Sequence, residues 1–537
     1  MRTETGPVRL VGDVPFDTAR RRGRRPALLF RDRRLTHDDL AGRVDRLAGL
    51  LVAAGVGPGE RVALAMENHP DYVVAYFAVC RTGAVLVPLN TFLVTTEVAA
   101  LLEDAECQTL LASSRWLEEH GSASDRIRPP QRLLILGEET RNVPAHLPPG
   151  TRLITQQPPV GGPNAPPRID QDDPAVVIYT SGTTGIPKGV ILTHRNLLGN
   201  ARGCIDAVGV RPRDRIIVAL PLFHSFTQMV GMLGPILAGM SIVLCEKLDR
   251  AEIKRALLRR RPTIFPAVPA VFTAMADARV SLLARWLNPV RLYISGGAPL
   301  PIETLRAFER KFSRPLCEGY GLSEAGPVVS LSPRKGARKA GSVGRPLPGV
   351  EVMTVDADGR DTRQGEPGEL LVRGPGVMKG YFRRPEETRL ALRDGWLRTG
   401  DQARIDEDGE IFIVGRNKDM LIFRGMNIYP REIEGVLESH PAVREAAVVG
   451  HPDTSRGEIP WAFVALRSEL PDAEGELRRY CIRNLARYKV PRGVVVLADL
   501  PRSAAGKVLK SDLRLRITPP GDRTRGAQGD RGLQRGN

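Results

Sequence analysis

The chain has 537 residues, of which 42% are hydrophobic and 26% charged, and its formal net charge is +17. A chain this long exceeds one ordinary hydrophobic core, so we expect two or more globular domains. The arginines are scattered, and no aromatic residues interleave with a basic run, which excludes a nucleic-acid-binding platform. We attribute most of the positive net charge to an arginine-rich composition. Weak attraction to an anionic membrane surface is the second explanation for that charge.

Cysteine usage and the N-terminus indicate a reduced, cytoplasmic protein without a leader segment. The six cysteines show no CxxC spacing and no neighbouring histidines, as is typical of reduced, buried thiols. Residues 1–6 lack the apolar core of a signal peptide.

The first elements predict a parallel α/β sheet. Thr36 is placed to cap a helix whose apolar residues recur every three or four positions, and Gly55 ends it. Arg61–Ala65 reads as a strand, Pro70 begins a second helix, and Ala84–Val87 is a second strand, which together form a βαβ pattern. Further strands are expected at Thr109–Ala112 and Leu133–Leu136.

A glycine- and hydroxyl-rich string from Tyr179 to Val190 follows another apolar, strand-like run. Glycines allow backbone N–H groups to approach an anion closely, the hydroxyls donate further hydrogen bonds, and Lys188 adds a positive charge. The string therefore predicts a polyphosphate site. It is not a Walker A loop, because Pro187 stands where that pattern has glycine before the lysine.

The run from Ile216 to Cys245 contains no Asp, Glu, Lys or Arg and is long enough to span a bilayer. Its prolines, glycines and polar residues instead favour a strand, a loop, a buried helix and a strand. His224 lies in this loop, and the methionine-containing segment after it could line an alkyl channel. Further strands are expected at Ser241–Leu244, Thr263–Phe265 and Arg291–Ser295.

Two short motifs that follow predicted strands contain residues suited to binding a flat ring or a metal ion. Ser295–Leu300 is rich in glycine, which permits a flat ring to approach the backbone. In Glu318–Glu324, the face of Tyr320 is suited to stacking on adenine, and Glu324 is a hard oxygen ligand suited to Mg²⁺.

The strand pattern changes from Val350 onward. Short predicted strands now follow one another closely, and Ala403–Val414 has the pattern of a hairpin around Asp408 and Gly409. Both features suggest an antiparallel, barrel-like subdomain. After Gly415 the pattern is that of small α+β units to about residue 515. The arginine-rich end of the chain, residues 516–537, has the composition of a disordered basic tail.

From about residue 30 to about residue 515, the chain resembles the adenylate-forming superfamily, which includes acyl-CoA synthetases, luciferases and nonribosomal-peptide adenylation domains. The resemblance rests on motifs that occur in the family's order: Tyr179–Val190, Pro221–His224, Ser295–Leu300, Glu318–Glu324, Gly368–Tyr381, Trp396–Asp401, Gly415–Asp419, Arg424–Glu434 and Pro501–Lys510. Ser503 departs from the threonine or asparagine that is frequent in the family.

The resemblance implies an α/β fold in two domains. Residues 1–417 would form an N-terminal adenylation domain of layered α/β sheets plus a β-barrel-like subdomain, and residues 418–515 a small, mobile α+β domain. It also implies two reactions, in which a carboxylic acid and ATP give acyl-AMP and pyrophosphate, and a thiol, that of CoA, then displaces AMP. ATP, Mg²⁺ and CoA would be required.

The same resemblance assigns roles to individual residues. Lys507 would serve adenylation, Glu324 would hold Mg²⁺, Lys418 would be the domain hinge, and Gly425 would leave room for the pantetheine of CoA. The acyl pocket would include His224, Ser225 and Gly296. The nucleotide would contact Thr180, Ser181, Gly182, Thr183, Thr184, Gly185, Lys188, Gly297, Ala298, Glu318, Gly319, Tyr320, Gly321, Ser323, Asp401 and Arg416, with Thr180 also counted as catalytic.

The uncharged, methionine-containing stretch after His224 favours a medium- or long-chain fatty acid as substrate. An aryl acid of coumarate or benzoate type is the alternative. Two alternatives belong to a different functional class. The chain could be a stand-alone adenylation protein that loads a carrier protein, or a binding module that has lost catalysis. The sequence leaves the oligomeric state open.

Overall fold

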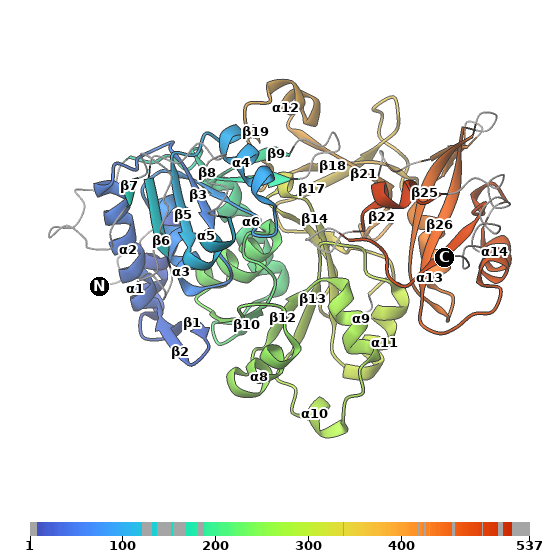
Figure 1. Ribbon diagram of the computed structural model, residues 1–537, viewed down its shortest axis with the longest axis horizontal. Helices are drawn as coiled ribbons and strands as arrows, with labels where there is room; N and C mark the ends of the chain where they lie inside the picture. The colour runs from blue at the N-terminus through green and yellow to red at the C-terminus, as the bar shows by residue number, and fades with distance from the viewer. Residues whose placement is uncertain are drawn as a thin grey trace, which may run out of the picture. The chain divides into compact units, whose positions relative to one another are not determined.

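The computed structural model describes residues 8–120, 132–136, 152–153, 168–180, 187–336, 338–416, 419, 421–423, 426–428, 430–453, 457–485, 487–502 and 508–517. The chain forms two compact units (Figure 1). The larger comprises Met1–Leu300, Thr304–Thr399 and Ala403–Ile413, and the smaller comprises Pro301–Glu303, Gly400–Gln402 and Val414–Asn537. The boundary expected between residues 417 and 418 lies outside the described residues, as does nearly all of the expected basic tail, so both stay predictions.

One large sheet carries the expected βαβ pattern. Its strand order is β19-β9-β8-β4-β3-β5-β6-β7, parallel from β8 to β7 and antiparallel where β9 joins β8 and β19 joins β9. The bounds are β19 (Gly380–Tyr381), β9 (Lys188–Thr193), β8 (Pro174–Thr180), β4 (Val85–Pro88), β3 (Arg61–Ala65), β5 (Thr109–Ser113), β6 (Arg132–Leu136) and β7 (Arg152–Leu153). The predicted parallel arrangement is confirmed.

The second large sheet has the order β16-β15-β14-β13-β12-β10-β11-β1-β2, with parallel strands from β14 to β1 and antiparallel strands at both edges. The bounds are β16 (Arg345–Pro346), β15 (Val328–Leu331), β14 (Leu316–Gly321), β13 (Leu292–Ser295), β12 (Ile264–Ala267), β10 (Arg215–Val218), β11 (Ser241–Leu244), β1 (Pro26–Phe30) and β2 (Arg33–Thr36).

A layer of helices lies between these two sheets. Alternate residues of each strand face opposite sides, so Leu64 and Ile216 join the same central cluster, whereas Ala63 and Ile217 face two separate outer clusters. The central layer contains α1 (Val14–Arg22), α2 (His37–Ala53), α3 (Pro70–Arg81), α6 (His194–Val208) and α7 (Gly234–Leu237). The outer layers contain α4 (Thr95–Asp104) and α5 (Ser114–His120) on one side, and α8 (Arg250–Arg260), α9 (Pro269–Asp277) and α11 (Ile302–Phe312) on the other.

Local signals explain several boundaries. Thr36 and Asp39 form the capping box of α2, with each side chain bonded to the other residue's backbone N–H. Pro70 begins α3, as expected. The six cysteines are free, and Cys107 alone among them is less than fully buried.

The uncharged run from Ile216 to Cys245 forms, as expected, strand β10, a loop, a buried helix and strand β11. The helix differs from expectation in type: Thr227–Leu233 (η3) is a π-helix, and the N–H of Gly234 bonds to the carbonyl of Met229 five residues earlier. None of the helices in the described part of the chain combines the length and apolarity that crossing a membrane requires.

A third sheet follows in the chain, with the order β17-β18-β21-β20 and β22 paired to β21. Its bounds are β17 (Glu351–Val355), β18 (Gly368–Arg373), β21 (Trp396–Ile405), β20 (Leu392–Arg393) and β22 (Ile411–Arg416), and α12 (Pro385–Ala391) precedes β20. The antiparallel pairing and the predicted hairpin between β21 and β22 are confirmed. Asp406 closes its turn by accepting hydrogen bonds from the N–H groups of Asp408 and Glu410.

The smaller unit is an α+β unit, as predicted. Its sheet has the order β24-β23-β26-β25, with β27 paired to β26. The bounds are β24 (Met426–Ile428), β23 (Leu421–Phe423), β26 (Gly457–Leu466), β25 (Val443–Asp453), β27 (Val494–Leu497), α13 (Pro430–Glu438), α14 (Ala473–Asn484) and α15 (Lys510–Arg514). Two separate apolar clusters fill this unit. The predicted α/β fold class is thus confirmed.

Candidate active site

The predicted phosphate string joins two paired strands. β8 and β9 are antiparallel, and their last pair is Thr180 with Lys188, so the segment between them starts and ends at neighbouring positions. The Thr180 Oγ1 donates a weak, 3.5 Å hydrogen bond to the carbonyl of Lys188. Ser181, Gly182, Thr183, Thr184 and Gly185 lie outside the described residues, so their contacts stay predictions.

Three side chains from distant parts of the chain meet beside this hairpin. β19 pairs with β9, which places Tyr381 opposite Val190. The Nζ of Lys188 lies 5.4 Å from the centroid of the Tyr381 ring, a cation–π contact. The hydroxyl of Tyr381 donates a 3.1 Å hydrogen bond to Oε1 of Glu324. Two residues predicted from separate motifs, Lys188 and Glu324, therefore contact the same tyrosine.

Tyr381 is the residue that sequence reasoning missed. The Gly368–Tyr381 segment matched a family motif, but no chemistry followed from its side chains. Burial and then the negative charge of Glu324 raise the pKa of the Tyr381 phenol above its ordinary value. The phenol therefore stays protonated and remains a donor to the carboxylate. The sequence signals at this position were the family motif and the adjacent Gly380, whose φ of 153° in the structure is easily reached by glycine.

The backbone around Glu324 is fixed by hydrogen bonds. The carbonyl of Glu324 accepts from the N–H of Met378 at 2.8 Å. Buried Asn200 on α6 donates to the carbonyls of Ala325 and Val328, at 3.3 and 2.7 Å, and accepts from the N–H of Val328 at 3.2 Å. The Glu324 carboxylate thus projects from a rigid segment.

This arrangement suits Mg²⁺ held jointly with a phosphate. The described residues contain no group of three or more His, Cys, Asp or Glu side chains that could cage a metal ion. Mg²⁺ does not need such a cage, because it commonly binds one or two carboxylates plus phosphate oxygens. Glu324, with one oxygen already oriented by Tyr381, fits that mode.

The two glycine motifs lie at the ends of neighbouring strands. β13 and β14 are parallel and pair Ser295 with Glu318, so Gly296–Ala298 and Gly319–Gly321 follow at the same edge. A Cβ on Gly321 would come within 1.9 Å of the carbonyl oxygen of Pro327, so this close approach requires glycine. Tyr320 and Ser323 continue the second motif.

Glu318 has a clear structural contact. Its side chain is almost fully buried, and Oε1 accepts a 2.9 Å hydrogen bond from the N–H of Leu300. The carboxylate therefore ties the loop after β13 to the end of β14, and it positions the expected nucleotide loops.

The segment after His224 is tied to the same motif. Ser225 and Ser323 share a 3.1 Å hydrogen bond between hydroxyl oxygens. The rings of Phe223 and His224 are 4.3 Å apart, and Phe92 contacts Phe223 edge-on at 5.7 Å. The expected acyl and nucleotide motifs are thus adjacent.

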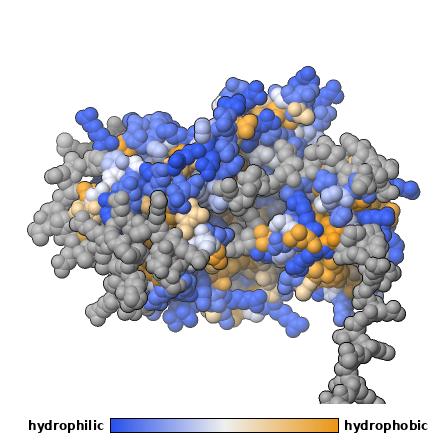
Figure 2. Space-filling model, turned by 45° about the horizontal axis from the view of Figure 1, so that its top comes forward, coloured by the Kyte–Doolittle hydropathy of each residue, from blue (hydrophilic) through white to orange (hydrophobic). Residues whose placement is uncertain are grey.

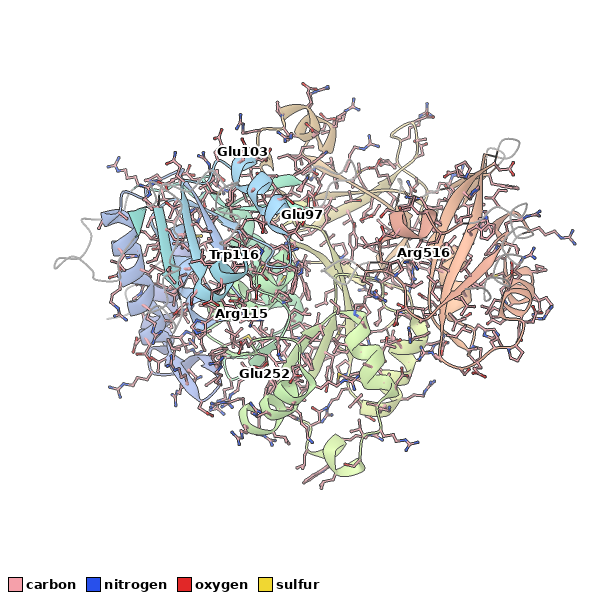
Figure 3. The ribbon with its side chains drawn as sticks, viewed as in Figure 1. Glu97, Glu103, Arg115, Trp116, Glu252 and Arg516 are labelled. Atoms are coloured by element: carbon pink, nitrogen blue, oxygen red, sulfur yellow. The ribbon has the colours of Figure 1, made fainter. Side chains whose placement is uncertain are left out.

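The loop that carries Phe92 is held from the outer helix layer. His120 on α5 stacks on Trp116 with 4.5 Å between ring centroids, and its Nε2 lies 3.0 Å from the carbonyl oxygen of Leu93 (Trp116 is labelled in Figure 3). This contact fixes the backbone beside Phe92.

A small cavity, partly open to solvent, lies next to these residues. Its lining is apolar except for one hydroxyl, and no charged side chain is part of it. The lining consists of Val218, Ala219, Leu220, Phe226, Thr227, Val230, Gly231 and Pro266. His224 and Ser225 lie in the chain between Leu220 and Phe226 of this lining. Gly296 adjoins the lining, since a Cβ there would lie 3.0 Å from the Phe226 ring.

The remaining predicted residues belong to the smaller unit. Asp401 lies within β21 and is 3% exposed, and Arg416 ends the paired strand β22. Arg502 and Val508 form an isolated antiparallel bridge. Lys507, which falls between them, and Lys418 and Gly425 lie outside the described residues, and the side chain of Arg416 does too.

The chain matches the AMP-binding enzyme model over residues 16–382 and the AMP-binding enzyme C-terminal domain over residues 432–507. It belongs to the AMP-binding enzyme family. The predicted superfamily and its acyl-CoA synthetase branch are confirmed, and the family's enzymes are acid–CoA ligases that use ATP, Mg²⁺ and CoA.

Relatives of similar identity differ in the acid they are named for. The chain is 33% identical to the long-chain-fatty-acid–CoA ligase of Bacillus subtilis (strain 168), with 94% of each chain covered. It is 36% identical to a feruloyl-CoA synthase of Amycolatopsis sp, covering 95% of this chain and 98% of that one. The ATP-bound structure of MatB from Rhodopseudomonas palustris superposes with a TM-score of 0.85 at 32% identity, over 94% of this chain and 98% of that one.

The contact between Tyr381 and Glu324 yields a first test. Tyr381→Phe keeps the ring beside Lys188 but removes the hydrogen bond to Glu324, and hydrogen bonds to charged groups contribute about 1.5–3 kcal/mol. We expect the Mg²⁺ concentration for half-maximal acyl-AMP formation to rise by about tenfold or more. The measurement is pyrophosphate release at saturating ATP over a Mg²⁺ series.

Tyr179→Phe is the matched control. The Tyr179 hydroxyl also donates to a carboxylate, Asp104 Oδ2, at 2.6 Å. Its removal should leave the Mg²⁺ dependence unchanged. Equal Mg²⁺ curves for the two variants would contradict the role given to Tyr381.

Proposed function

We propose that this acid–CoA ligase activates an apolar monocarboxylic acid, with a medium- or long-chain fatty acid as the preferred class. The observation that carries the proposal is the cavity after β10, whose lining has no charged side chain. An α-ammonium group or a second carboxylate would be buried there without a partner, at a cost of several kcal/mol. A hydrocarbon tail has no such cost.

The uncharged lining, and not the size of the cavity, supports this proposal. The enclosed part of the cavity has room for about one water molecule, far less than the roughly 300–1,000 Å³ of pockets for drug-sized ligands. Side chains around it would have to move to admit an acyl chain, so the proposal covers medium and long chains alike.

An aryl acid with a polar ring substituent is the second candidate. Thr227 lines the cavity, is 4% exposed, and its Oγ1 has no hydrogen-bond partner among the described residues. Buried hydroxyls are normally paired, so a phenolic or ether oxygen of the acid is a suitable partner. The feruloyl-CoA synthase relative is consistent with this candidate.

In the proposed mechanism, the acid carboxylate attacks the α-phosphorus of ATP and pyrophosphate leaves. Thr180, Lys188 and the hydroxyls of residues 181–184 hold the β- and γ-phosphates, and Lys507 stabilises the charge that develops between carboxylate and α-phosphate. When bound, Mg²⁺ neutralises phosphate charge, and Glu324 is the residue that holds it. Tyr381 keeps the Glu324 carboxylate oriented.

Nucleotide positioning is assigned to the remaining motifs. Tyr320 stacks on adenine between the loops Gly296–Ala298 and Gly319–Gly321. Asp401 accepts hydrogen bonds from both ribose hydroxyls, and Arg416 reaches the ribose or the phosphates. In the second half-reaction, rotation at Lys418 withdraws Lys507 and brings Gly425 to the site, where the CoA thiol attacks the acyl carbon and AMP leaves.

A screen of acids tests the substrate class. Within the cavity, kcat/KM should rise about fourfold per methylene, since each buried methylene contributes about 0.8 kcal/mol. The rise should stop at the chain length at which the acyl site is filled. Higher activity with benzoate- or cinnamate-type acids than with every alkanoate would instead favour the aryl alternative. Running the screen with and without CoA distinguishes CoA from a carrier-protein acceptor.

Gly231→Leu tests the cavity itself. A Cβ at Gly231 would lie 3.0 Å from Val218 Cγ2, so the leucine side chain must occupy cavity space. We expect KM to rise at least tenfold for the longest accepted acids and to change little for the shortest. Gly42→Leu is the control, because only the flexible Arg46 side chain lies within 4 Å of its Cβ position. Uniform loss of activity on all acids would contradict this assignment.

The ribose contact is tested by Asp401→Ala. Two charge-assisted hydrogen bonds contribute roughly 2–3 kcal/mol, so the KM for ATP should rise by about 30–160-fold. The KM for the acid should stay close to its wild-type value, and Asp401→Asn should retain part of the ATP affinity. An unaltered ATP saturation curve in Asp401→Ala would show that this residue has another role.

Separate assays of the two half-reactions test the domain rotation. Lys507→Ala should slow adenylation by roughly 10²–10³-fold, the scale for losing one preorganised charge partner. Supplied with acyl-AMP, it should still form thioester at nearly the normal rate. Gly425→Leu should do the opposite, because its side chain would obstruct the thiol.

Lys510→Ala is the matched lysine control, because Lys510 lies in the same unit and pairs with Glu434 at 2.8 Å. It should leave the ratio of the two half-reaction rates unchanged. If Lys507→Ala slows both half-reactions equally, the rotation mechanism is wrong.

A further inference from the structure

A cluster of large apolar side chains is exposed on α10 (Leu282–Trp286). Trp286 is 80% exposed, Leu283 64% and Leu287 42%. The N–H of Leu287 bonds to the carbonyl of Leu283, so the helical turn continues to Leu287. Positions i, i+3 and i+4 lie on one helical face, so these three side chains form one patch. Single exposed apolar residues are common, but a patch that includes a tryptophan indicates an interaction surface.

The segment that carries this patch is fixed at both ends. Before α10, Lys311 Nζ donates to the carbonyl of Ala276 and, at 2.7 Å, to that of Ala278. After α10, Asn288 donates to the Tyr293 hydroxyl at 2.7 Å. These hydrogen bonds on both sides of α10 therefore hold the helix in place with its apolar face toward solvent.

The end of this segment is also tied to the second large sheet. Arg291 pairs with the buried carboxylate of Asp214 at 2.5 Å. Figure 1 shows the result, because α10 is the outermost element at the lower edge of the larger unit.

Basic residues accompany a second apolar exposure on α8, which packs on the same outer face of the sheet as α9 and α11. Leu258 is 62% exposed. Arg255 and Arg259 lie three residues before it and one after it, and both are exposed. Further exposed basic residues in and beside these helices are Arg250, Lys254, Arg261 and Arg279.

The acidic residues of α8 are engaged within the chain. Glu252 (labelled in Figure 3) accepts hydrogen bonds from the N–H groups of Glu246 and Lys247, and Asp249 caps the helix by accepting from the Glu252 N–H. The solvent-facing charge of α8 is therefore predominantly positive. In Figure 1, α8 lies along the same lower edge as α10.

We propose that α10 and α8 form a docking surface for an anionic lipid bilayer. Tryptophan and leucine insert at the level of the lipid head groups, where the indole ring is favoured. Arginine and lysine side chains beside them are attracted to anionic head groups. Figure 2 shows a face of the molecule on which hydrophilic residues predominate among the coloured ones, with hydrophobic residues in scattered patches. The proposal does not depend on which acid the enzyme activates.

Vesicle binding of the full-length protein tests this surface. One set of vesicles contains phosphatidylcholine alone, and the other also contains phosphatidylglycerol and a brominated lipid that quenches tryptophan. We expect sedimentation with the anionic vesicles at low salt, release at high salt, and quenching of tryptophan emission. Trp286→Phe should still bind but lose most of the quenching, because Trp116 and Trp461 are buried and Trp396 is half-buried in β21 of another sheet, under the Arg373 side chain. Quenching that persists in this variant would overturn the proposal.

Paired variants distinguish vesicle binding by this surface from non-specific binding to lipid. Leu283→Ser with Trp286→Ser should weaken vesicle binding at least tenfold, whereas Leu390→Ser, at a 66% exposed leucine on α12, should not. Arg255→Gln with Arg259→Gln should weaken binding to anionic vesicles about tenfold. Arg389→Gln with Arg393→Gln removes the same charge elsewhere and should have little effect. Equal losses in target and control pairs would overturn the proposal.

Sedimentation velocity without lipid tests the competing occupant, a second copy of the chain. Concentration-dependent self-association that disappears in Leu283→Ser with Trp286→Ser would assign the patch to that contact and overturn the proposal. Activity on a water-soluble acid should be unchanged in every variant, because none of these residues lies in the proposed active site.

Discussion

The amide of Asn68 joins the carboxyl ends of the two large sheets. Asn68 follows β3, is 4% exposed, and donates to the carbonyls of Leu220 and Cys245 at 2.9 and 3.0 Å, while it accepts from the N–H of Leu222 at 2.8 Å. These partners follow β10 and β11 of the other sheet. A buried side chain that satisfies three backbone groups is costly to replace, because each group would be left unpaired. The cavity and the His224 segment begin directly after this junction.

The Asn68 junction explains why residues from two separate sheets meet at a single site. Parallel strands end at the same edge, and the helix layer between the sheets places two such edges within reach of each other. Asn200 on α6 makes a second junction, to Ala325 and Val328. Lys188 and Glu324 come from different sheets, and Tyr381 contacts both because its strand extends the first sheet beside β9.

Local signals were sufficient for much of the fold. Arg61–Ala65 and Ser241–Leu244 were predicted with their exact bounds, because each is a short run of mainly apolar residues between polar or glycine-rich segments. The Thr36 cap and the hairpin between β21 and β22 were predicted for similar reasons. The π-helix was not predicted, because an apolar run has the same appearance in an α-helix and a π-helix.

The site was only partly predictable for a physical reason. Lys188 and Glu324 belong to motifs with recognisable spacing, but the role of Tyr381 depends on the pairing of β19 with β9, across about 190 residues of chain. The lining of the cavity likewise depends on how η3 packs against β10 and β12. Such packing has no local signature, so the lining of the cavity could not be predicted from the sequence.

The π-helix has a consequence for how this fold diversifies. A π-turn contains an additional residue, and each residue in a helix rotates the next by about 100°. Deletion of one residue between Thr227 and Leu233 would restore α-helical spacing and turn a different set of side chains toward Val218 and Pro266. The strands before and after it, and the loops with Lys188 and Glu324, would keep their registers. If the cavity holds the acid as proposed, a change of one codon in length, rather than a series of substitutions, would be a short evolutionary route to an enzyme for another acid.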